Sequence, residues 1–367
     1  MTGATAAGRY RHPVRSPLVL GIETSCDDTA CALVDGGGRV LASVVSSQLA
    51  AHAPFGGVVP EIAAREHLAN WPAVAGAALA AARATLAEVD AVAATRGPGL
   101  VGALLVGLAI GRAFAWARGR PFFAIHHLEG HLYSPWLGAV GEPSAPVPDR
   151  FVGLVVSGGH TSLYRVADGA IETVAETRDD AFGEAFDKLG KRLGLAYPQG
   201  PKVDELAELG DPRRARLSRL AGTEELFFSY SGLKTQVLVE LERLAARGVR
   251  TAAAAAAQDP LPAEVLDLVA AFRDSAVRQV LDRLTRLHRR EPFARLAVSG
   301  GAAANRELRR RLPEWAAERD VELHLVPLAY SGDNAAMIAF AALRRLARGV
   351  AGDDPLATSA ESRLPVG

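Results

Sequence analysis

The chain alternates short apolar runs with polar turns, and one such arrangement occurs twice. Residues 18–24 are mostly apolar, residues 25–28 are polar, and residues 29–34 are apolar again. The same order returns about 130 residues later, in 151–156, 157–160 and 161–166. An apolar run, a tight polar turn and a second apolar run predict a β-hairpin. Two copies of this hairpin predict two domains of related design.

Helical and strand patterns alternate after each hairpin, which predicts an α/β architecture. The predicted helices cover 71–86, 102–117, 305–312 and 334–348, and the predicted strands cover 91–95, 121–125, 296–298 and 323–326.

The Pro-rich segment 143–148 lacks apolar periodicity and is the best candidate for a domain boundary. We therefore expect a loose tail at 1–17, a first domain at 18–147 and a second domain at 148–348, whose last helix is free to return to the first. Residues 349–367 would form a C-terminal tail. The Ala-rich segment 248–262 is expected to connect two helices.

Charge and hydropathy narrow the function classes. The 41 Lys and Arg residues balance the 41 Asp and Glu residues, so contact with nucleic acid requires a local patch. Two groups of arginines could form such a patch, although solvated helix faces explain them equally well. The first group is Arg213, Arg214, Arg216 and Arg219, and the second is 309–311.

The longest apolar stretch, 101–110, spans about ten residues, whereas a membrane helix needs about twenty. We expect no membrane segment.

The two cysteines, Cys26 and Cys31, are too few to act as a disulfide framework. We therefore expect a reducing compartment and a cytoplasmic protein.

His127 and His131 are the clearest candidate metal ligands. They lie four residues apart after a predicted strand, so on a helix both imidazoles project from one face. The zinc-peptidase pattern needs a glutamate directly after the first histidine, but Glu129 comes one position too late. A peptidase is therefore disfavoured. Two histidines hydrogen-bonded at a buried helix start remain the alternative.

Asp333 directly precedes the last predicted helix, and its spacing favours an N-cap. Two histidines and one carboxylate also form the ligand set of a catalytic iron(II) or zinc ion. The spacing leaves both roles open.

Glycine-containing turns follow several predicted strands, at 157–160, 299–301 and 330–333. Such turns can cradle a phosphate, but ordinary turn chemistry explains them equally well. The acidic cluster of Asp179, Asp180, Glu184 and Asp187 beside Lys188 has the pattern of a solvated helix face.

Eight segments taken together resemble the tRNA N6-adenosine threonylcarbamoyltransferase family, over about residues 18–348. They are Gly21-Ile-Glu-Thr-Ser-Cys-Asp-Asp-Thr29, Gly56-Gly-Val-Val-Pro-Glu61, Gly97-Pro-Gly-Leu-Val-Gly102, His127-Leu-Glu-Gly-His131, Val156-Ser-Gly-Gly-His-Thr161, Gly183-Glu-Ala-Phe-Asp-Lys188, Phe228-Ser-Tyr-Ser-Gly-Leu-Lys-Thr235 and Ser331-Gly-Asp-Asn-Ala-Ala-Met337.

The resemblance implies two ribonuclease-H-like domains of the actin, Hsp70 and sugar-kinase fold, facing across a cleft. It implies transfer of a threonylcarbamoyl group from threonylcarbamoyl-AMP to the N6 amine of adenosine 37, in tRNAs reading codons that start with A, with release of AMP. The implied partners are tRNA, an inactive paralogue that forms a heterodimer with the chain, and a small ATPase.

The resemblance also implies roles for particular residues. His127, His131 and Asp333 match the family's metal ligands, with Fe²⁺ as the first choice and Zn²⁺ as the second. Glu23 could orient a ligand histidine, and no nucleophilic side chain is assigned. Gln199 departs from the pattern, because many members have glycine there. The contacts to the adenylate would come from Val155, Val156, Ser157, Gly158, Gly159, Asp187, Gly200, Asp204 and Asn305.

An ATP-driven kinase or chaperone-like module is the main alternative, because the fold serves phosphotransferases as readily as acyl transfer. The histidine pair discriminates between them, since a sugar kinase needs a catalytic base and no metal-binding imidazoles. A metallopeptidase is the third reading.

Overall fold

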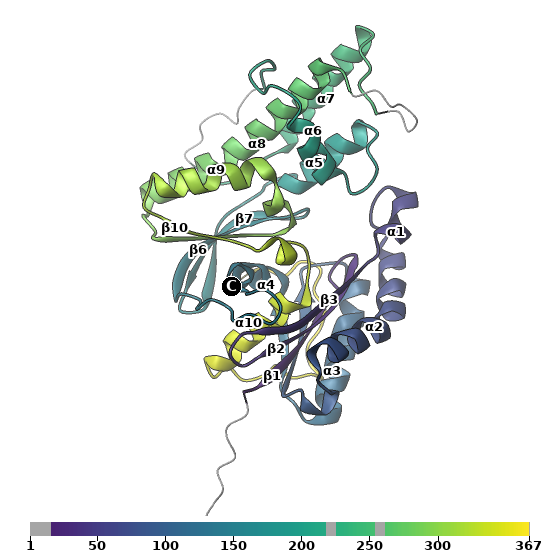
Figure 1. Cartoon of the computed structure of the whole chain (residues 1–367), viewed down its shortest axis with the longest axis vertical. Coiled ribbons are helices and arrows are strands. Elements are labelled where there is room, and N and C mark those ends of the chain that lie inside the picture. Colours follow the sequence, from purple (N-terminus) through teal and green to yellow (C-terminus); the bar gives the residue numbers. More distant parts are fainter. Residues whose placement is uncertain (1–15, 218–224, 254–260, 367) are drawn as a thin grey trace, which may run out of the picture.

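The structure is a computed structural model that describes residues 16–217, 225–253 and 261–366. Two five-stranded sheets form its centre (Figure 1). The strand orders are β3-β2-β1-β4-β5 and β10-β9-β6-β7-β8. In both sheets a three-stranded antiparallel meander continues into two strands parallel to its first strand. The predicted α/β class and the predicted duplicated hairpin are therefore confirmed.

The strands of the first sheet are β1 (Leu18–Glu23), β2 (Asp28–Asp35), β3 (Val40–Ser47), β4 (Ala91–Gly97) and β5 (Phe122–His126). Those of the second are β6 (Arg150–Val156), β7 (Thr161–Ala167), β8 (Ala170–Glu176), β9 (Arg295–Ser299) and β10 (Glu322–Leu325). Both hairpin turns, between β1 and β2 and between β6 and β7, begin where the first strand of their sheet ends. This is the edge at which the parallel strands also end, so both turns lie beside loops that follow β4 and β9.

The α-helices are α1 (Leu49–His52), α2 (Pro60–Ala82), α3 (Val101–Arg118), α4 (His127–Tyr133), α5 (Phe182–Arg192), α6 (Gln199–Ala207), α7 (Ser231–Ala246), α8 (Ala263–Arg290), α9 (Arg306–Ala317) and α10 (Ala335–Ala347). Helix α2 begins eleven residues before the predicted start at residue 71 and contains Pro72. A buried stripe that includes Ala63, His67 and Val74 holds this helix on the sheet, which outweighs the hydrogen bond lost at the proline.

Helices cover both faces of the first sheet. Gly107 of α3 lies where a Cβ would be 2.4 Å from Thr24 Oγ1, so α3 packs closely on one face. On the other face Gly21 lies under α10, where a Cβ would be 2.3 Å from the carbonyl oxygen of Ala335. Helix α10 follows the second sheet in the chain but packs on β1 and β2. The last helix thus returns to the first sheet, while the domain boundaries themselves stay a prediction.

Helix α3 is the one helix among the described residues that is long and apolar enough to cross a membrane, by length and composition alone. It extends beyond the predicted apolar stretch because further apolar residues follow Arg112. Six of its residues, among them Leu104, Leu108 and Ala115, are buried inside the fold. A packed core helix passes the same test, so this helix is weak support for a membrane span.

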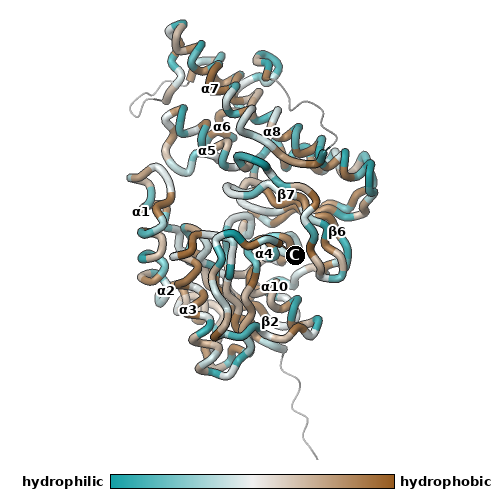
Figure 2. Tube along the Cα trace, turned by 180° about the vertical axis from the view of Figure 1, so that it is seen from behind, coloured by the Kyte–Doolittle hydropathy of each residue, from teal (hydrophilic) through white to brown (hydrophobic). Residues whose placement is uncertain are grey.

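Helix α4 lies at the junction of the two halves (Figure 1). All seven of its residues are buried, and it packs against β6, β9 and α10. The second sheet is covered by helices such as α8, where hydrophobic and hydrophilic residues alternate along the trace (Figure 2). After α10 the chain runs back beside the first sheet, where Asp353 pairs with Phe122 of β5.

Candidate functional site

Helix α4 presents the two histidines predicted as metal ligands. It begins at His127, directly after β5, so His127 and His131 lie one helical turn apart as expected. Their rings are 4.7 Å apart and nearly perpendicular, and both side chains are buried.

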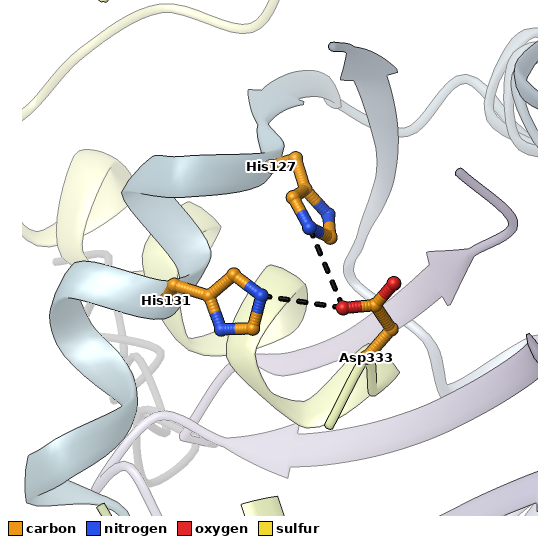
Figure 3. Close-up of side chains that lie close together, drawn as sticks. All are labelled: His127, His131 and Asp333. Atoms are coloured by element: carbon orange, nitrogen blue, oxygen red, sulfur yellow. Dashed lines mark hydrogen bonds and ion pairs between the residues drawn. The ribbon is translucent and has the colours of Figure 1, made fainter. Parts of the chain in front are cut away.

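Asp333 lies opposite this pair (Figure 3). Its Oδ1 is 3.4 Å from Nε2 of His127 and 3.2 Å from Nε2 of His131. The three ligand atoms all lie within 4.8 Å of one another. The N-cap role that spacing favoured for Asp333 is wrong, because Asn334 caps α10 by accepting a hydrogen bond from the Met337 amide at 3.0 Å. The Asp333 carboxylate is therefore available to the histidines.

Glu23, at the end of β1, contacts His127. Its Oε2 lies 3.1 Å from Nδ1 of His127 and accepts a hydrogen bond from the Thr95 hydroxyl at 2.6 Å. A carboxylate that accepts from Nδ1–H directs Nε2 toward a metal, as in many carboxylate–histidine–metal sites. The role that the resemblance suggested for Glu23 has a geometric basis here, although it stays a proposal.

The carboxylates also set the charge state of the site. Burial lowers the pKa of His127, but Asp333 and Glu23 outweigh this effect and raise it to about 9. Burial raises the pKa of Asp333, but the two histidines outweigh it and hold the pKa well below its usual range. Without a metal, a protonated His127 therefore balances part of the negative charge of the Asp333 and Glu23 carboxylates. A divalent cation could replace that proton.

The donor set fits a transition metal. Two imidazole nitrogens and one carboxylate oxygen converge, and this combination suits iron(II) or zinc. Nδ1 of His131 is buried without a hydrogen-bond partner in the described residues, so its ring is fixed through Nε2 alone.

Glu129, the residue that a peptidase would need one position earlier, faces α10. It forms an ion pair with Arg345, whose pKa is raised by this partner against the lowering effect of burial. Gly130 packs so closely beneath α10 that a Cβ would lie 3.0 Å from Met337 Cγ. Glu129 thus connects α4 to α10 through this ion pair, which argues against the peptidase hypothesis.

The turn between β6 and β7 exposes backbone rather than side chains. The Ser157 amide donates to the carbonyl oxygen of His160, and the His160 amide donates to Ser157 Oγ at 3.0 Å. A Cβ added at Gly158 or Gly159 would have nothing within 4 Å, so the outer side of this turn is open. Gly300 packs against the inner side of this turn. Its φ is 94°, and an added Cβ would lie 2.3 Å from the carbonyl oxygen of Val156. Only glycine fits there.

The other residues that the resemblance linked to the adenylate lie in two contacting pairs. Asp187 of α5 accepts a hydrogen bond from the Gly200 amide at 2.7 Å. Asn305, the N-cap of α9, donates to Asp204 at 2.7 Å, and Asp204 also binds Arg273 at 3.1 Å. Gly183 of α5 packs against the carbonyl oxygen of Ser157, which ties this region to the glycine turn.

Gln199, which the resemblance marked as a departure from the family pattern, fits the local backbone. It is the first residue of α6 and is not among the residues with positive φ. Its side chain is buried and packs against Gly190, where an added Cβ would lie 2.4 Å from Gln199 Cβ. The backbone freedom of glycine is therefore not needed at this position.

The acidic cluster is only partly a solvated helix face. Glu184 and the exposed Lys188 form the predicted i to i+4 pair, whereas Asp180 is buried. Asp180 forms ion pairs with Lys188 and Lys234, and Phe182 and Phe186 stack beneath them at 4.7 Å, as expected for the buried side. Lys188 also pairs with Glu184 at 2.9 Å, so both lysines already have carboxylate partners within the cluster.

Sequence reasoning missed three residues around the histidines. Ser25 Oγ lies 3.2 Å from Nδ1 of His127, and His126 accepts a hydrogen bond from the Leu128 amide as the N-cap of α4. His160 interacts electrostatically with His127, His131 and Asp333, and burial lowers the pKa of His160 to about 4. The quoted segments contain Ser25 and His160, and His126 directly precedes one of them, but a pattern does not reveal contacts across a fold.

Comparison with known proteins agrees with this site. The family model described as tRNA N6-adenosine threonylcarbamoyltransferase matches residues 39–340. Proteins of that name from Burkholderia thailandensis and Sorangium cellulosum are 47% and 44% identical over 333 and 357 residues. The first alignment covers 90% of this chain and 93% of its relative, and the second covers 95% and 97%.

Solved structures support the fold. HypF of T.kodakarensis aligns with a TM-score of 0.59 at 12% identity, over 91% of this chain and 48% of that one. A full-length HypF in the phosphate- and nucleotide-bound form aligns with a TM-score of 0.58 at 12% identity, over 92% and 57%. The two mixed sheets with flanking helices are those of the actin, Hsp70 and sugar-kinase fold. The family match and the identities show that the chain belongs to the tRNA N6-adenosine threonylcarbamoyltransferase family and is a tRNA-modifying transferase.

Proposed function

We propose that this chain transfers the threonylcarbamoyl group from threonylcarbamoyl-AMP to the N6 amine of adenosine 37, in tRNAs that read codons starting with A. The observation that carries the proposal is the His127, His131 and Asp333 triad beside an open glycine turn, in a chain of this family. The triad suits a metal-assisted acyl transfer, and the turn suits a phosphate.

His127, His131 and Asp333 would hold one divalent metal, with Fe²⁺ as the first choice and Zn²⁺ as the second. When bound, such an ion supplies Lewis acidity, which makes a carbonyl carbon more electrophilic. Glu23 would keep the His127 ring in the ligand orientation by accepting its Nδ1–H.

The adenylate would be held by the second half of the molecule. No atom lies within 4 Å of a Cβ added at Gly158 or Gly159, so a phosphate could approach this turn closely, and their amides would donate to it. Val155, Val156 and Ser157 would form the base of the turn. Asp187, Gly200, Asp204 and Asn305 would contact the nucleoside. Arg273 would keep the Asp204 carboxylate in place.

The transfer itself needs no covalent enzyme intermediate. The N6 amine forms a bond to the carbamoyl carbon, the bond between that carbon and the phosphate oxygen breaks, AMP leaves, and the amine loses one proton. The chain's residues orient the donor and stabilise the leaving phosphate with preorganised amides. Trapping a threonylcarbamoyl group on a side chain would contradict this account.

Binding of tRNA would rely on a local patch. Arg213 and Arg214 already pair with Asp211, and Arg310 pairs with Glu307. Arg309 bonds to carbonyl oxygens and is half-buried, which lowers its pKa. Arg216 is exposed and stays a candidate for phosphate contact, while Arg219 lies outside the described residues.

We also propose a heterodimer with an inactive paralogue, assisted by a small ATPase, in the cytoplasm. The helices α2 and α3 expose large apolar side chains that such a partner could cover, namely Leu68, Leu105 and Trp116. If the chain and the paralogue stay separate when mixed and sized, this part of the proposal fails.

The test of function is incorporation of labelled threonine into unmodified tRNA, with bicarbonate, ATP, the adenylate-forming enzyme and the bacterial partners. His131→Ala should lower incorporation by more than about a hundredfold, because it removes a metal ligand. His324→Ala is the matched control, since His324 also faces a carboxylate, Glu322 at 3.0 Å, but on the surface of the second sheet. Equal loss in both variants, or no label with the metal-loaded wild type, would contradict the proposed function.

A further inference from the structure

The chain after α10 forms a strap, residues 353–364, that follows the end of the first sheet toward the metal site. It starts beside β5, the edge strand, where the Asp353 amide donates to the carbonyl oxygen of Phe122 at 2.7 Å. The Asp353 carboxylate accepts from the Ala124 amide at 2.8 Å. The strap lies beyond residues 39–340, the range that the family model matches.

The strap then crosses the end of β4. Arg96 forms an ion pair with Glu361 and donates to the carbonyl oxygen of Ser359 at 3.3 Å. The Glu361 amide donates back to the carbonyl oxygen of Arg96 at 3.0 Å. Gly97 allows this approach, because a Cβ there would lie 2.0 Å from the carbonyl oxygen of Glu361.

The last contact of the strap reaches the ligand helix. The carbonyl oxygen of Leu364 lies 2.9 Å from Nε2 of His126. A carbonyl can only accept, so Nε2 carries the hydrogen, and Nδ1 of the neutral ring accepts from the Leu128 amide at 3.1 Å. His126 therefore links the strap to the first turn of α4. Both views of the molecule show the described end of the chain near α4 (Figures 1 and 2).

A second route runs from the strap to the other side of His127. The Gly99 amide donates to the carbonyl oxygen of Ser362 at 3.4 Å, and the next amide, that of Leu100, donates to the carbonyl oxygen of Ser25 at 2.8 Å. Ser25 Oγ lies 3.2 Å from Nδ1 of His127. The strap thus supports the backbone of His127 through His126 and its imidazole through Ser25.

We propose that the strap is a positioning element of the metal site, with His126 as its positioning residue, so that metal affinity depends on a segment that contributes no ligand. The inference rests on the proposed function, since it assumes that the triad binds a metal. The first amides of a helix have no partner within the helix, so in a helix of seven residues the first turn depends on contacts from outside. Ligand sets lose affinity when their supporting contacts are removed.

The experiment measures Co²⁺ binding to the full-length, metal-stripped chain by visible absorption. His126→Asn is the central variant, because asparagine can still cap α4 but is too short to reach Leu364. We expect about tenfold weaker Co²⁺ binding and an altered absorption band, as found when contacts behind a ligand are lost. Arg96→Gln, which releases Glu361, should weaken binding about threefold. Arg295→Gln is the matched control, because Arg295 forms a similar half-exposed pair with Glu322 on the second sheet.

Hydrogen exchange of the α4 amides, measured without metal, gives an independent readout. The Leu128 amide should exchange faster in Arg96→Gln than in Arg295→Gln, although neither variant alters α4 itself. Wild-type Co²⁺ affinity and unchanged exchange in His126→Asn and Arg96→Gln would overturn the positioning role. Failure of the wild-type chain to bind Co²⁺ would instead overturn the metal site of the proposed function.

Discussion

The two hairpin turns of this molecule occupy the same place in two sheets of the same connectivity, but they differ in chemistry. The turn after β1 is surrounded by buried polar side chains, Glu23, Ser25 and Thr95, which hold one another and His127. The turn after β6 carries Gly158 and Gly159, with open space where side chains would be. A duplicated scaffold can thus hold charge through side chains in one half and offer amides in the other.

The strongest test of this comparison removes the charge from the first turn. Glu23→Gln should weaken Co²⁺ binding by about 30- to 100-fold, because His127 loses the carboxylate that fixes its ring and the site loses one negative charge. Calorimetric titration of the metal-stripped chain measures this effect. Thr95→Val, which removes one hydrogen bond to Glu23 but keeps the carboxylate, should have a smaller effect. If the Glu23→Gln variant binds metal as tightly as the wild type, side-chain charge is not the contribution of this turn.

A milder change alters the second turn. Gly158→Ala should lower the affinity for AMP up to about tenfold, because a methyl group shields an amide that would otherwise donate to the phosphate. The melting temperature should stay the same, since the added Cβ meets no neighbour. Gly232→Ala, at another open position, is the matched control. Equal AMP affinity in both variants would show that the turn does not meet the nucleotide.

The smallest expected effect concerns Asp28, just after the first turn. Burial, and then the neighbouring carboxylates, raise its pKa to about 7, while a hydrogen bond from Ser47 opposes them. Between about pH 4 and pH 7 the unfolded chain has lost this proton and the folded chain retains it. The free energy of unfolding should therefore fall as the pH rises through this window and level off above it.

Asp28→Asn should remove this slope. Relative to wild type, the variant should gain about 1–2 kcal/mol between pH 5 and pH 8, measured by urea unfolding of the metal-stripped chain. Asp35→Asn, on the same strand, is the control. A difference that is constant with pH would mean that Asp28 is already ionised in the folded protein.

Much of the fold was predictable because local patterns decide it. The hairpin strands alternate with polar turns, so β1, β2, β6 and β7 were predicted within two residues of their ends. The first half of α2 was missed, because it lies between Pro60 and Pro72, and proline usually interrupts a helix. Packing against β2 and β3 stabilises the helix there. The strap has no periodicity at all, and its place is set by contacts with Arg96 and His126 that lie far away in sequence.

The site was predictable to a different degree. The spacing of His127 and His131 indicated a shared helix face, but the spacing of Asp333 pointed to the wrong cap, since Asn334 takes that role. The resemblance to a family, rather than the periodicity of the sequence, predicted that Asp333 lies beside the two histidines. The contacts of Ser25 and His126 follow from the packing of separate elements, which a single sequence does not encode as a pattern.

The return of α10 to the first sheet has a consequence for the order of events during synthesis. His131 and Asp333 are 202 residues apart in the chain, and both are needed for a complete ligand set. At about 5–20 residues per second, a ribosome makes the carboxylate roughly 10 to 40 s after the histidines. The nascent chain would therefore carry the two imidazoles without the third proposed ligand while these 202 residues are made. Capture of a metal by all three proposed ligands would have to wait until Asp333 has been made.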